Sequence, residues 1–264
     1  MIVHDQMGRK VELERTPGRI VSIVPSQTEL LHYLGLREEV VGITKFCIHP
    51  DEWFRSKTRV GGTKQLDLQK IIALEPDLVI ANKEENNKEQ VEELSRHVPV
   101  WISDINTLGE ALEMIGQVGA LMGRPEKATE LVQQVKKGFE GIATQGFPTL
   151  KTCYLIWKNP YMTVGGDTFI HDLLQRAGFA NLFASAGRYP EITVDQLKEG
   201  NCELLLLSSE PYPFRQKHVE ELQALLPGTK ITLVDGEAFS WYGSRLLHSP
   251  SYFEQLQQQI KRIC

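Results

Sequence analysis

The chain has 264 residues, of which 41% are hydrophobic and 24% charged, and its net charge is −5. This composition fits a globular protein with one large or two ordinary domains. The lack of a basic excess argues against nucleic acid or an anionic membrane as the main partner. No apolar run approaches the ~20 residues that span a bilayer, so we expect a protein that does not cross the membrane.

The first half of the chain alternates apolar runs with helical patterns. Residues 2–14 predict a small hairpin around Gly8. Strands are predicted at 19–25, 40–44, 76–81 and 98–102, helices at 28–35, 68–74, 83–97 and 108–122, and loops at 25–29 and 45–62. Strands that alternate with helices in this way indicate a parallel sheet.

One long helix is predicted over residues 125–145. Its apolar residues recur at the i, i+3, i+4, i+7 spacing from Ala128 to Ala143, which gives about six turns and roughly 30 Å of helix. Pro125 suits the first helical position, and Gly146 followed by Pro148 suits the end. Because no Gly/Ser-rich linker flanks it, we expect this helix to be a rigid connection between two lobes.

The second half repeats the alternation of the first. Strands are predicted at 152–157, 203–207 and 230–234, and helices at 168–177, 193–199, 217–226 and 250–263. The predicted fold is therefore α/β, with two Rossmann-like lobes of parallel sheet joined by the long helix. The predicted domains are residues 1–122 with the hairpin, the connecting helix at 123–147, and residues 148–264.

In open parallel sheets, ligands bind outside the carboxyl ends of the strands. The loops that follow the predicted strands are 25–29, 45–62 and 82–87 in the first lobe, and 158–167, 208–215 and 236–245 in the second. We expect these two sets of loops to line a ligand cleft between the lobes.

The four cysteines, Cys47, Cys153, Cys202 and Cys264, are far apart and form no CxxC pair. This spacing argues against a zinc knuckle or a disulfide scaffold, so we expect reduced thiols. The first residues contain no basic segment followed by an apolar one. The sequence therefore predicts a cytoplasmic protein, or a periplasmic or cell-envelope protein from which a signal was removed.

Several stretches together resemble one known family. They are Asp5–Val11, Arg19–Leu30, Leu68–Ile80 and the long helix. The chain resembles the helical-backbone (class III) periplasmic-type substrate-binding proteins of ABC importers, which are receptors for cobalamin, haem and ferric siderophores, and it is most similar to the cobalamin-binding branch. The resemblance implies two lobes, a rigid connecting helix, a metal-complex ligand, an ABC permease as partner and no enzymatic activity.

The resemblance also implies a docking surface for the permease. In the cobalamin receptors, an acidic residue on the outer surface of each lobe contacts basic residues of the permease, and the matching positions here are Gln69 and Asp195. One of the two charges is therefore missing. Charge pairs at the rim of an interface mainly steer association, so this loss weakens docking without excluding it.

Residues 45–50 place a thiol and an imidazole two positions apart, at Cys47 and His49. Cobalt in a corrinoid and iron in haem both accept such axial ligands, so either residue is a candidate metal ligand. In the alternative, Cys47 packs as a small hydrophobic side chain and His49 hydrogen-bonds within its loop. A nucleophilic Cys47 is disfavoured because no base with an orienting partner is visible near it.

Further ligand-binding candidates lie on the predicted loops of both lobes. Lysines there would contact anionic edges of a ligand, and aromatic side chains would form the walls around a flat tetrapyrrole. The full set of ligand-binding candidates is Pro25, Ser26, Lys45, Phe46, His49, Lys64, Lys83, Glu84, Trp157, Tyr161, Tyr189, Trp241, Tyr242 and Arg245. Tyr212 is a further candidate at the rim.

Three functions remain open at this point. The first is non-enzymatic binding of a cobalt corrinoid, with no intrinsic cofactor and no catalytic residues. The second is binding of haem or a ferric siderophore, for which the cationic loops would be decisive. The third is a chelatase-like enzyme that acts on tetrapyrroles, with His49 and a carboxylate such as Glu84 exchanging protons and metal, although no acid/base constellation is recognisable.

Overall fold

The computed structural model describes residues 1–143 and 150–263. It divides into two compact units. Unit 1 contains Met1–Ile105, Gly109–Gln134 and Tyr242–Arg245, and unit 2 contains Asn106–Leu108, Val135–Trp241 and Leu246–Cys264. The predicted stop at Gly146 and Pro148, with Thr144, Gln145 and Cys264, lies outside the described residues.

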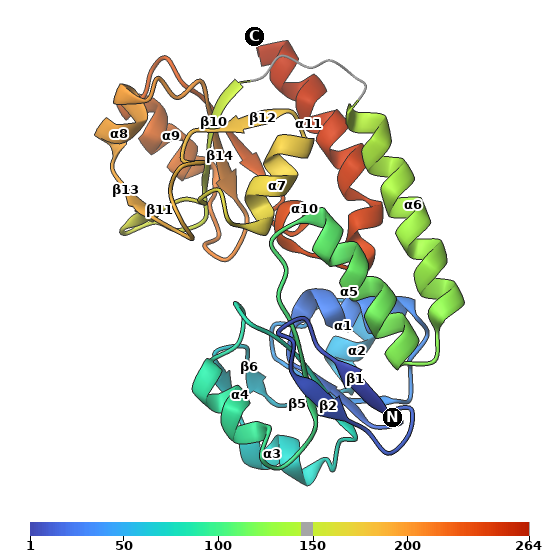
Figure 1. The fold of residues 1–264 in the computed structure, drawn as a ribbon. Helices are drawn as coiled ribbons and strands as arrows, with labels where there is room; N and C mark the ends of the chain where they lie inside the picture. Colours follow the sequence, from blue (N-terminus) through green and yellow to red (C-terminus); the bar gives the residue numbers. More distant parts are fainter. Residues whose placement is uncertain (144–149, 264) are drawn as a thin grey trace. The chain divides into compact units, whose positions relative to one another are not determined.

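The sheet of unit 1 has five strands, all parallel (Figure 1). Their order across the sheet is β5 (Thr58–Arg59), β4 (Val40–Ile43), β3 (Ile20–Ser22), β8 (Leu78–Asn82) and β9 (Val100–Ser103). Val21 pairs with Val79 on one side and with Gly42 on the other. The near-continuous apolar runs of β3 and β8 are typical of strands buried on both faces, as both are here.

Unit 1 has the predicted helices and one further helix, α2, and several predicted bounds need correction. Its helices are α1 (Pro25–Tyr33), α2 (Asp51–Ser56), α3 (Leu68–Ala73), α4 (Lys88–Leu94) and most of α5 (Leu108–Leu121). The loop predicted at 45–62 was wrong in extent, because it contains α2, β5 and β6 (Gly61–Gly62), and β6 forms a small hairpin with β7 (Gln65–Leu66). The loop predicted at 25–29 was wrong because α1 already begins at Pro25, whose fixed φ suits a first helical residue.

Helix α4 begins five residues later than the predicted start at Lys83. The side-chain oxygen of Asn82 accepts hydrogen bonds from the N–H groups of Glu84 and Glu85, at 2.8 and 3.0 Å. This local turn competes with helix formation. Asn87 then caps the helix by accepting from the N–H of Gln90.

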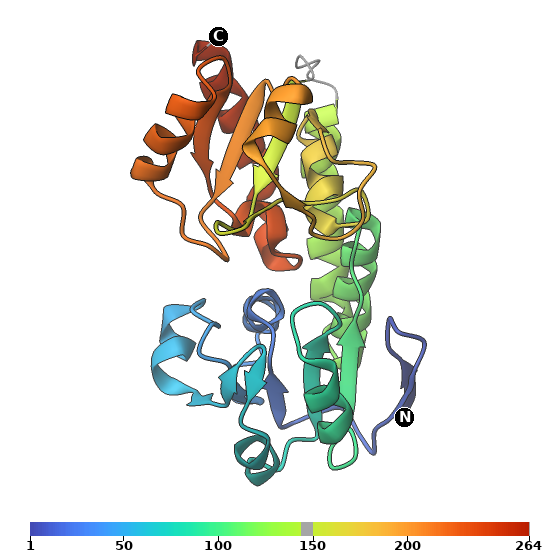
Figure 2. The same ribbon diagram turned by 90° about the vertical axis from the view of Figure 1, so that its left-hand side faces the viewer.

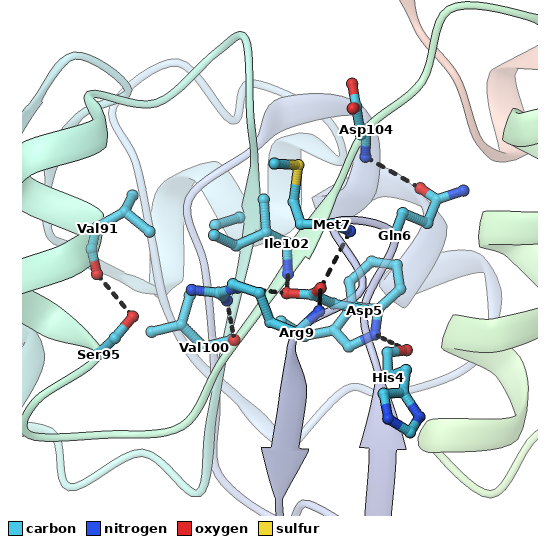
Figure 3. Close-up of polar contacts among 12 residues, drawn as sticks. His4, Asp5, Gln6, Met7, Arg9, Val91, Ser95, Val100, Ile102 and Asp104 are labelled. Atoms are coloured by element: carbon cyan, nitrogen blue, oxygen red, sulfur yellow. Dashed lines mark hydrogen bonds and ion pairs between the residues drawn. The ribbon is translucent and has the colours of Figure 1, made fainter.

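The predicted hairpin is confirmed as β1 (Ile2–His4) and β2 (Lys10–Glu12), which pair antiparallel. Its turn is built around Asp5 (Figure 3). The Asp5 side chain has no exposed surface. The Asp5 carboxylate accepts from the N–H groups of Met7 and Arg9 and from Nε of Arg9, at 2.8–3.0 Å. It also accepts from the N–H of Ile102 at 3.3 Å, and Nη2 of Arg9 donates to the carbonyl of Val100 at 2.7 Å. The hairpin therefore covers the free edge of β9.

The long helix is confirmed as α6 (Pro125–Ala143), and it runs from unit 1 into unit 2. In unit 1, Ala128 packs so closely on Gly119 of α5 that a Cβ on Gly119 would lie 2.1 Å from the Ala128 Cβ, and the two helices lie side by side (Figure 2). In unit 2, the Phe139 ring lies 6.3 Å from the ring of Phe253.

Unit 2 contains a second parallel sheet, as predicted. Its strand order is β12 (Phe179–Asn181), β10 (Leu150–Leu155), β14 (Leu204–Ser208) and β15 (Lys230–Val234). The helices of unit 2 are α7 (Phe169–Arg176), α8 (Val194–Glu199), α9 (Gln216–Leu225), α10 (Glu237–Ser240) and α11 (Ser249–Ile263), and the 3-10 turn η1 (Ser244–Leu247) spans the boundary between the units. The sequence did not predict β12, nor β11 (Tyr161–Met162) and β13 (Glu191–Ile192), which form a short antiparallel pair. The loop predicted at 236–245 was wrong in extent, because it contains α10 and the start of η1.

The two parallel sheets and the long helix confirm the predicted α/β fold class. The predicted domain boundaries stay a prediction. Cys47, Cys153 and Cys202 are free and buried. No helix in residues 1–143 or 150–263 has both the length and the apolar character needed to cross a membrane.

Candidate functional site

Because every strand of each main sheet runs parallel, the carboxyl ends of the strands meet at one edge of that sheet. In unit 1 this edge carries the start of α1, the β4 loop (residues 44–50) and the β8 loop (residues 83–87). In unit 2 it carries the β10 loop (residues 156–160) and the β14 loop (residues 209–215). These segments hold most of the side chains that the sequence singled out.

Cys47 anchors the β4 loop from inside. Its thiol is fully buried and contacts the hydroxyls of Thr28 at 3.1 Å and Thr44 at 3.2 Å. Burial raises the pKa of this thiol to about 11, so it is protonated at neutral pH. A thiolate is the form that binds metals, so this geometry favours the alternative in which Cys47 packs as a small hydrophobic side chain. His49 follows at a half-buried position.

The two residues next to Cys47 in the sequence have side chains that point out of the protein. Phe46 is 51% exposed and Ile48 is 44% exposed. The Lys45 ammonium lies 5.1 Å from the centre of the Phe46 ring, and a Cβ on Gly62 would lie 3.0 Å from that ring. Glycine at position 62 thus leaves room for the Phe46 ring. An inward thiol between two outward apolar side chains fixes the loop and presents a hydrophobic surface.

The predicted cationic residues of unit 1 lie on or beside these loops. Lys64 is exposed in the turn between β6 and β7, and its Nζ donates to the carbonyl of Glu84. Lys83 is exposed and its Nζ lies 2.6 Å from the carboxylate of Asp104. Glu84 is half-buried in the β8 loop. The loop therefore carries charges of both signs.

Pro25 and Ser26 form the first turn of α1, and both are buried. The Ser26 hydroxyl makes no hydrogen bond to any described residue. Burial in the first turn separates these two residues from the exposed side chains of the β4 loop. The sequence had grouped all of them as ligand contacts.

Tyr242 and Arg245, which belong to unit 1, are bound by carboxylates from earlier in the same unit. The Tyr242 hydroxyl donates to Glu85 at 2.6 Å. Arg245 donates through Nε and Nη2 to the two carboxylate oxygens of Glu29, at 3.0 and 2.6 Å. The side chain of Tyr242 is buried. The polar groups of both residues are therefore bonded to other side chains of the protein.

In unit 2, the β10 and β14 loops share an aromatic cluster. Trp157, 41% exposed, meets the ring of Tyr212 nearly edge-on at 5.7 Å, and Tyr212 in turn lies 4.8 Å from Phe214. The Tyr212 hydroxyl is 3.4 Å from Nε2 of the buried His218. Phe214 and His218 were not among the predicted residues, and the alternation of Tyr212 and Phe214 was the available hint.

The remaining aromatic candidates differ in exposure. Tyr161 and Tyr189 are half-buried. Trp241 is buried, and its indole N–H donates to the Glu210 carboxylate at 2.9 Å. The Ser240 hydroxyl donates to the same oxygen at 2.7 Å, and burial raises the pKa of Glu210. Trp241 therefore belongs to the packing of unit 2 in this structure.

Gln69 and Asp195 occupy matching places in the two units. Each is the second residue of a short helix, α3 or α8, and each is exposed. Asp67 caps α3 and Thr193 caps α8. Their role in docking stays a prediction.

Two properties define what the loops can do. Among the residues that the structure describes, no group of three or more His, Cys, Asp or Glu side chains is placed to hold a metal ion. Phe46, Ile48 and Trp157 are three of the eight large hydrophobic side chains that are exposed in this part of the chain. Apolar surface at the carboxyl ends of parallel strands indicates a binding site. The two parallel sheets and these loops together are those of a ligand-binding α/β protein.

The sequence profile of the periplasmic binding proteins matches residues 20–226, and the chain belongs to this family. It is 26% identical over 194 residues to the vitamin B12-binding protein of Vibrio parahaemolyticus, covering 72% of this chain and 70% of the relative. It is also 26% identical over 215 residues to an uncharacterised ABC transporter substrate-binding lipoprotein of Bacillus subtilis, covering 77% of this chain and 68% of the relative.

A solved structure has the same fold. The periplasmic haem-binding protein of Vibrio cholerae aligns with a TM-score of 0.76 and 21% identity, covering 92% of this chain and 98% of the other. The family and these relatives are named as binding proteins, and the relative from Bacillus subtilis is named as the substrate-binding lipoprotein of an ABC transporter.

Proposed function

We propose that this chain is the substrate-binding component of an ABC importer, that it is not an enzyme, and that its ligand is a cobalt corrinoid of the cobalamin type. The observation that carries the proposal is the exposure of Phe46, Ile48 and Trp157 on loops at the carboxyl ends of parallel strands. The similarity to a vitamin B12-binding protein supports the choice of ligand.

The chemistry of these loops suits a large, mostly apolar ligand. Phe46 in unit 1 and Trp157 in unit 2 are each able to pack on the face or edge of a macrocycle. Lys45 lies beside Phe46 and can bind an amide side chain of the ligand. Cys47 and the Asn82 turn hold the β4 and β8 loops in place before a ligand arrives. Such preorganisation lowers the entropy lost on binding.

The partner and the place of action follow from the same proposal. The relatedness to an ABC transporter substrate-binding lipoprotein supports an ABC permease as the partner and the cell envelope as the location. Gln69 and Asp195 on the exposed starts of α3 and α8 are the proposed permease contacts. With Gln69 uncharged, we expect most of the electrostatic steering to come from unit 2.

Binding of haem or a ferric chelate is the second candidate. It is favoured by Lys64, whose ammonium donates to backbone carbonyls and lies in no ion pair among the described residues. A cation of this kind could bind a carboxylate of the ligand. The shared fold with a haem-binding protein is compatible with this ligand.

A visible-absorbance titration with cobalamin, and in parallel with haemin, tests the proposal. We expect a saturable shift with cobalamin at micromolar protein. His49→Ala should alter the spectrum of the bound ligand if the imidazole contacts its metal, whereas His97→Ala, at an exposed position after α4, should leave the titration unchanged. A response to haemin alone would replace the corrinoid by the second candidate, and silence with both ligands would contradict the proposal.

A further inference from the structure

One short segment from late in the chain packs entirely on unit 1. We call Tyr242–Arg245 the strap. It belongs to unit 1, whereas Trp241 before it and Leu246 after it belong to unit 2. Fixing the backbone of these four residues against unit 1 costs conformational entropy. Specific contacts with unit 1 are needed to offset that cost. The strap has such a contact at three of its positions.

At the first position, the Tyr242 hydroxyl donates to Oε1 of Glu85 at 2.6 Å, across 157 residues of sequence. Glu85 lies in the β8 loop, where its N–H is bonded to the side chain of Asn82. Glu85 is therefore fixed twice: its side chain is bonded to the strap, and its backbone N–H is bonded to Asn82. The Tyr242 side chain is buried, so water competes little for this hydrogen bond.

At the second position, Gly243 lies against the first turn of α1. A Cβ on this residue would lie 3.0 Å from the carbonyl oxygen of Ser26 and 3.3 Å from the Cβ of Leu30. Its φ of 147° is one that side-chain-bearing residues rarely adopt. Glycine thus allows both the close approach and the backbone conformation.

At the last position, Arg245 forms a bidentate ion pair with Glu29 of the same helix, α1. Nε and Nη2 lie 3.0 and 2.6 Å from the two carboxylate oxygens of Glu29. The two side chains are only 20% and 22% exposed. A bidentate pair that is largely shielded from water is among the stronger ion pairs in proteins and also fixes orientation.

From these contacts we propose that Tyr242 and Arg245 are positioning residues for ligand binding. The strap joins the start of α1 to the β8 loop, two elements that follow the neighbouring strands β3 and β8. It holds them in one arrangement before the ligand arrives, and the ligand then binds without ordering them. This inference rests on the proposed function for its ligand, but the order of these elements can be measured without one.

The first test uses the ligand-free protein. Tyr242→Phe removes only the hydroxyl and with it the hydrogen bond to the Glu85 carboxylate. The β8 loop should then open more easily, so we expect amide hydrogen exchange of Glu84 and Glu85 to become about tenfold faster. Exchange in β14 of unit 2 should not change. Unchanged exchange at Glu84 and Glu85 would overturn the proposal for Tyr242.

The second test uses affinity and rescue. Arg245→Gln should weaken cobalamin binding about fivefold to tenfold, and the double variant Glu29→Arg with Arg245→Glu should recover most of that loss by restoring the pair in reverse. Arg55→Gln is the matched control, because Arg55 pairs with Asp51 on the exposed surface of α2. A swap that binds no better than Arg245→Gln would contradict a positioning role and indicate that Arg245 contacts the ligand.

The two tests separate this inference from the proposed function. If the wild-type protein does not bind cobalamin, the proposed ligand is wrong, and the exchange rates of Glu84 and Glu85 still decide whether the strap orders the loop. If the wild type binds cobalamin and all strap variants bind equally well, the strap proposal is overturned and the proposed function stands.

Discussion

Replacing Asp5 by alanine is expected to lower the free energy of unfolding of unit 1 by about 2–4 kcal/mol, because it removes a buried acceptor that several donors share. The Asp5 carboxylate has no exposed surface and accepts four hydrogen bonds, from Met7, from two groups of Arg9 and from Ile102. Alanine would leave the guanidinium of Arg9 without its carboxylate and release the hairpin from β9. Each buried donor left without an acceptor adds to the loss.

Urea unfolding followed by circular dichroism measures this effect. Asp51→Ala is the matched control, because it breaks the exposed pair with Arg55 on α2, for which we expect a change of less than about 0.5 kcal/mol. We also expect the Asp5 variant to associate at high concentration, because the exposed edge of β9 can then pair with another chain. A loss of stability no larger than that of the control would show that the hairpin is not held by Asp5.

The second large effect concerns ligand binding. Phe46→Ala and Trp157→Ala should each weaken cobalamin binding by about 10- to 100-fold, which corresponds to about 1.4–2.8 kcal/mol per side chain. Both side chains are exposed in the absence of ligand, so their burial on binding contributes hydrophobic free energy that alanine cannot supply. Neither change should alter the unfolding temperature by more than a few degrees.

Leu225→Ala is the matched control for both variants. Leu225 is 48% exposed, which is close to the exposure of Phe46 and Trp157, but it ends α9 next to the amino end of β15 rather than at a carboxyl end. Isothermal calorimetry should therefore give the wild-type affinity for this variant. Equal losses for Leu225→Ala and Trp157→Ala would show that the effect is not specific to the carboxyl-end loops.

Much of the fold could be predicted because the local pattern and the tertiary environment agree. The apolar runs of β8 and β14 are buried along their whole length, so their strand pattern is unambiguous. The stripe of α6 from Ala128 to Phe139 is buried as predicted. The elements that escaped prediction are short ones, such as the two-residue strands β5 and β11 and the six-residue helix α2, which are too short to show a clear period.

The candidate site was harder to predict, because exposure is set by tertiary contacts. Cys47 is buried and Phe46 beside it is exposed, and one of the two hydroxyls that contact the thiol belongs to Thr28, which is distant in sequence. Trp241 and Tyr242 look like wall residues in the sequence, but Glu210 and Glu85 occupy their polar groups. Carboxylates distant in sequence leave no local trace that a pattern could reveal.

The most direct test of the central claim is amide hydrogen exchange of the protein with and without saturating cobalamin. The claim is that ligand binds at the loops that follow the parallel strands. We expect slower exchange in residues 44–50 of unit 1 and in residues 156–160 and 209–215 of unit 2, with no change in the hairpin β1–β2 or at the amino ends of the strands. Saturating cobalamin that leaves all three loops unchanged, or that protects only the hairpin and residues 95–100, would contradict the account.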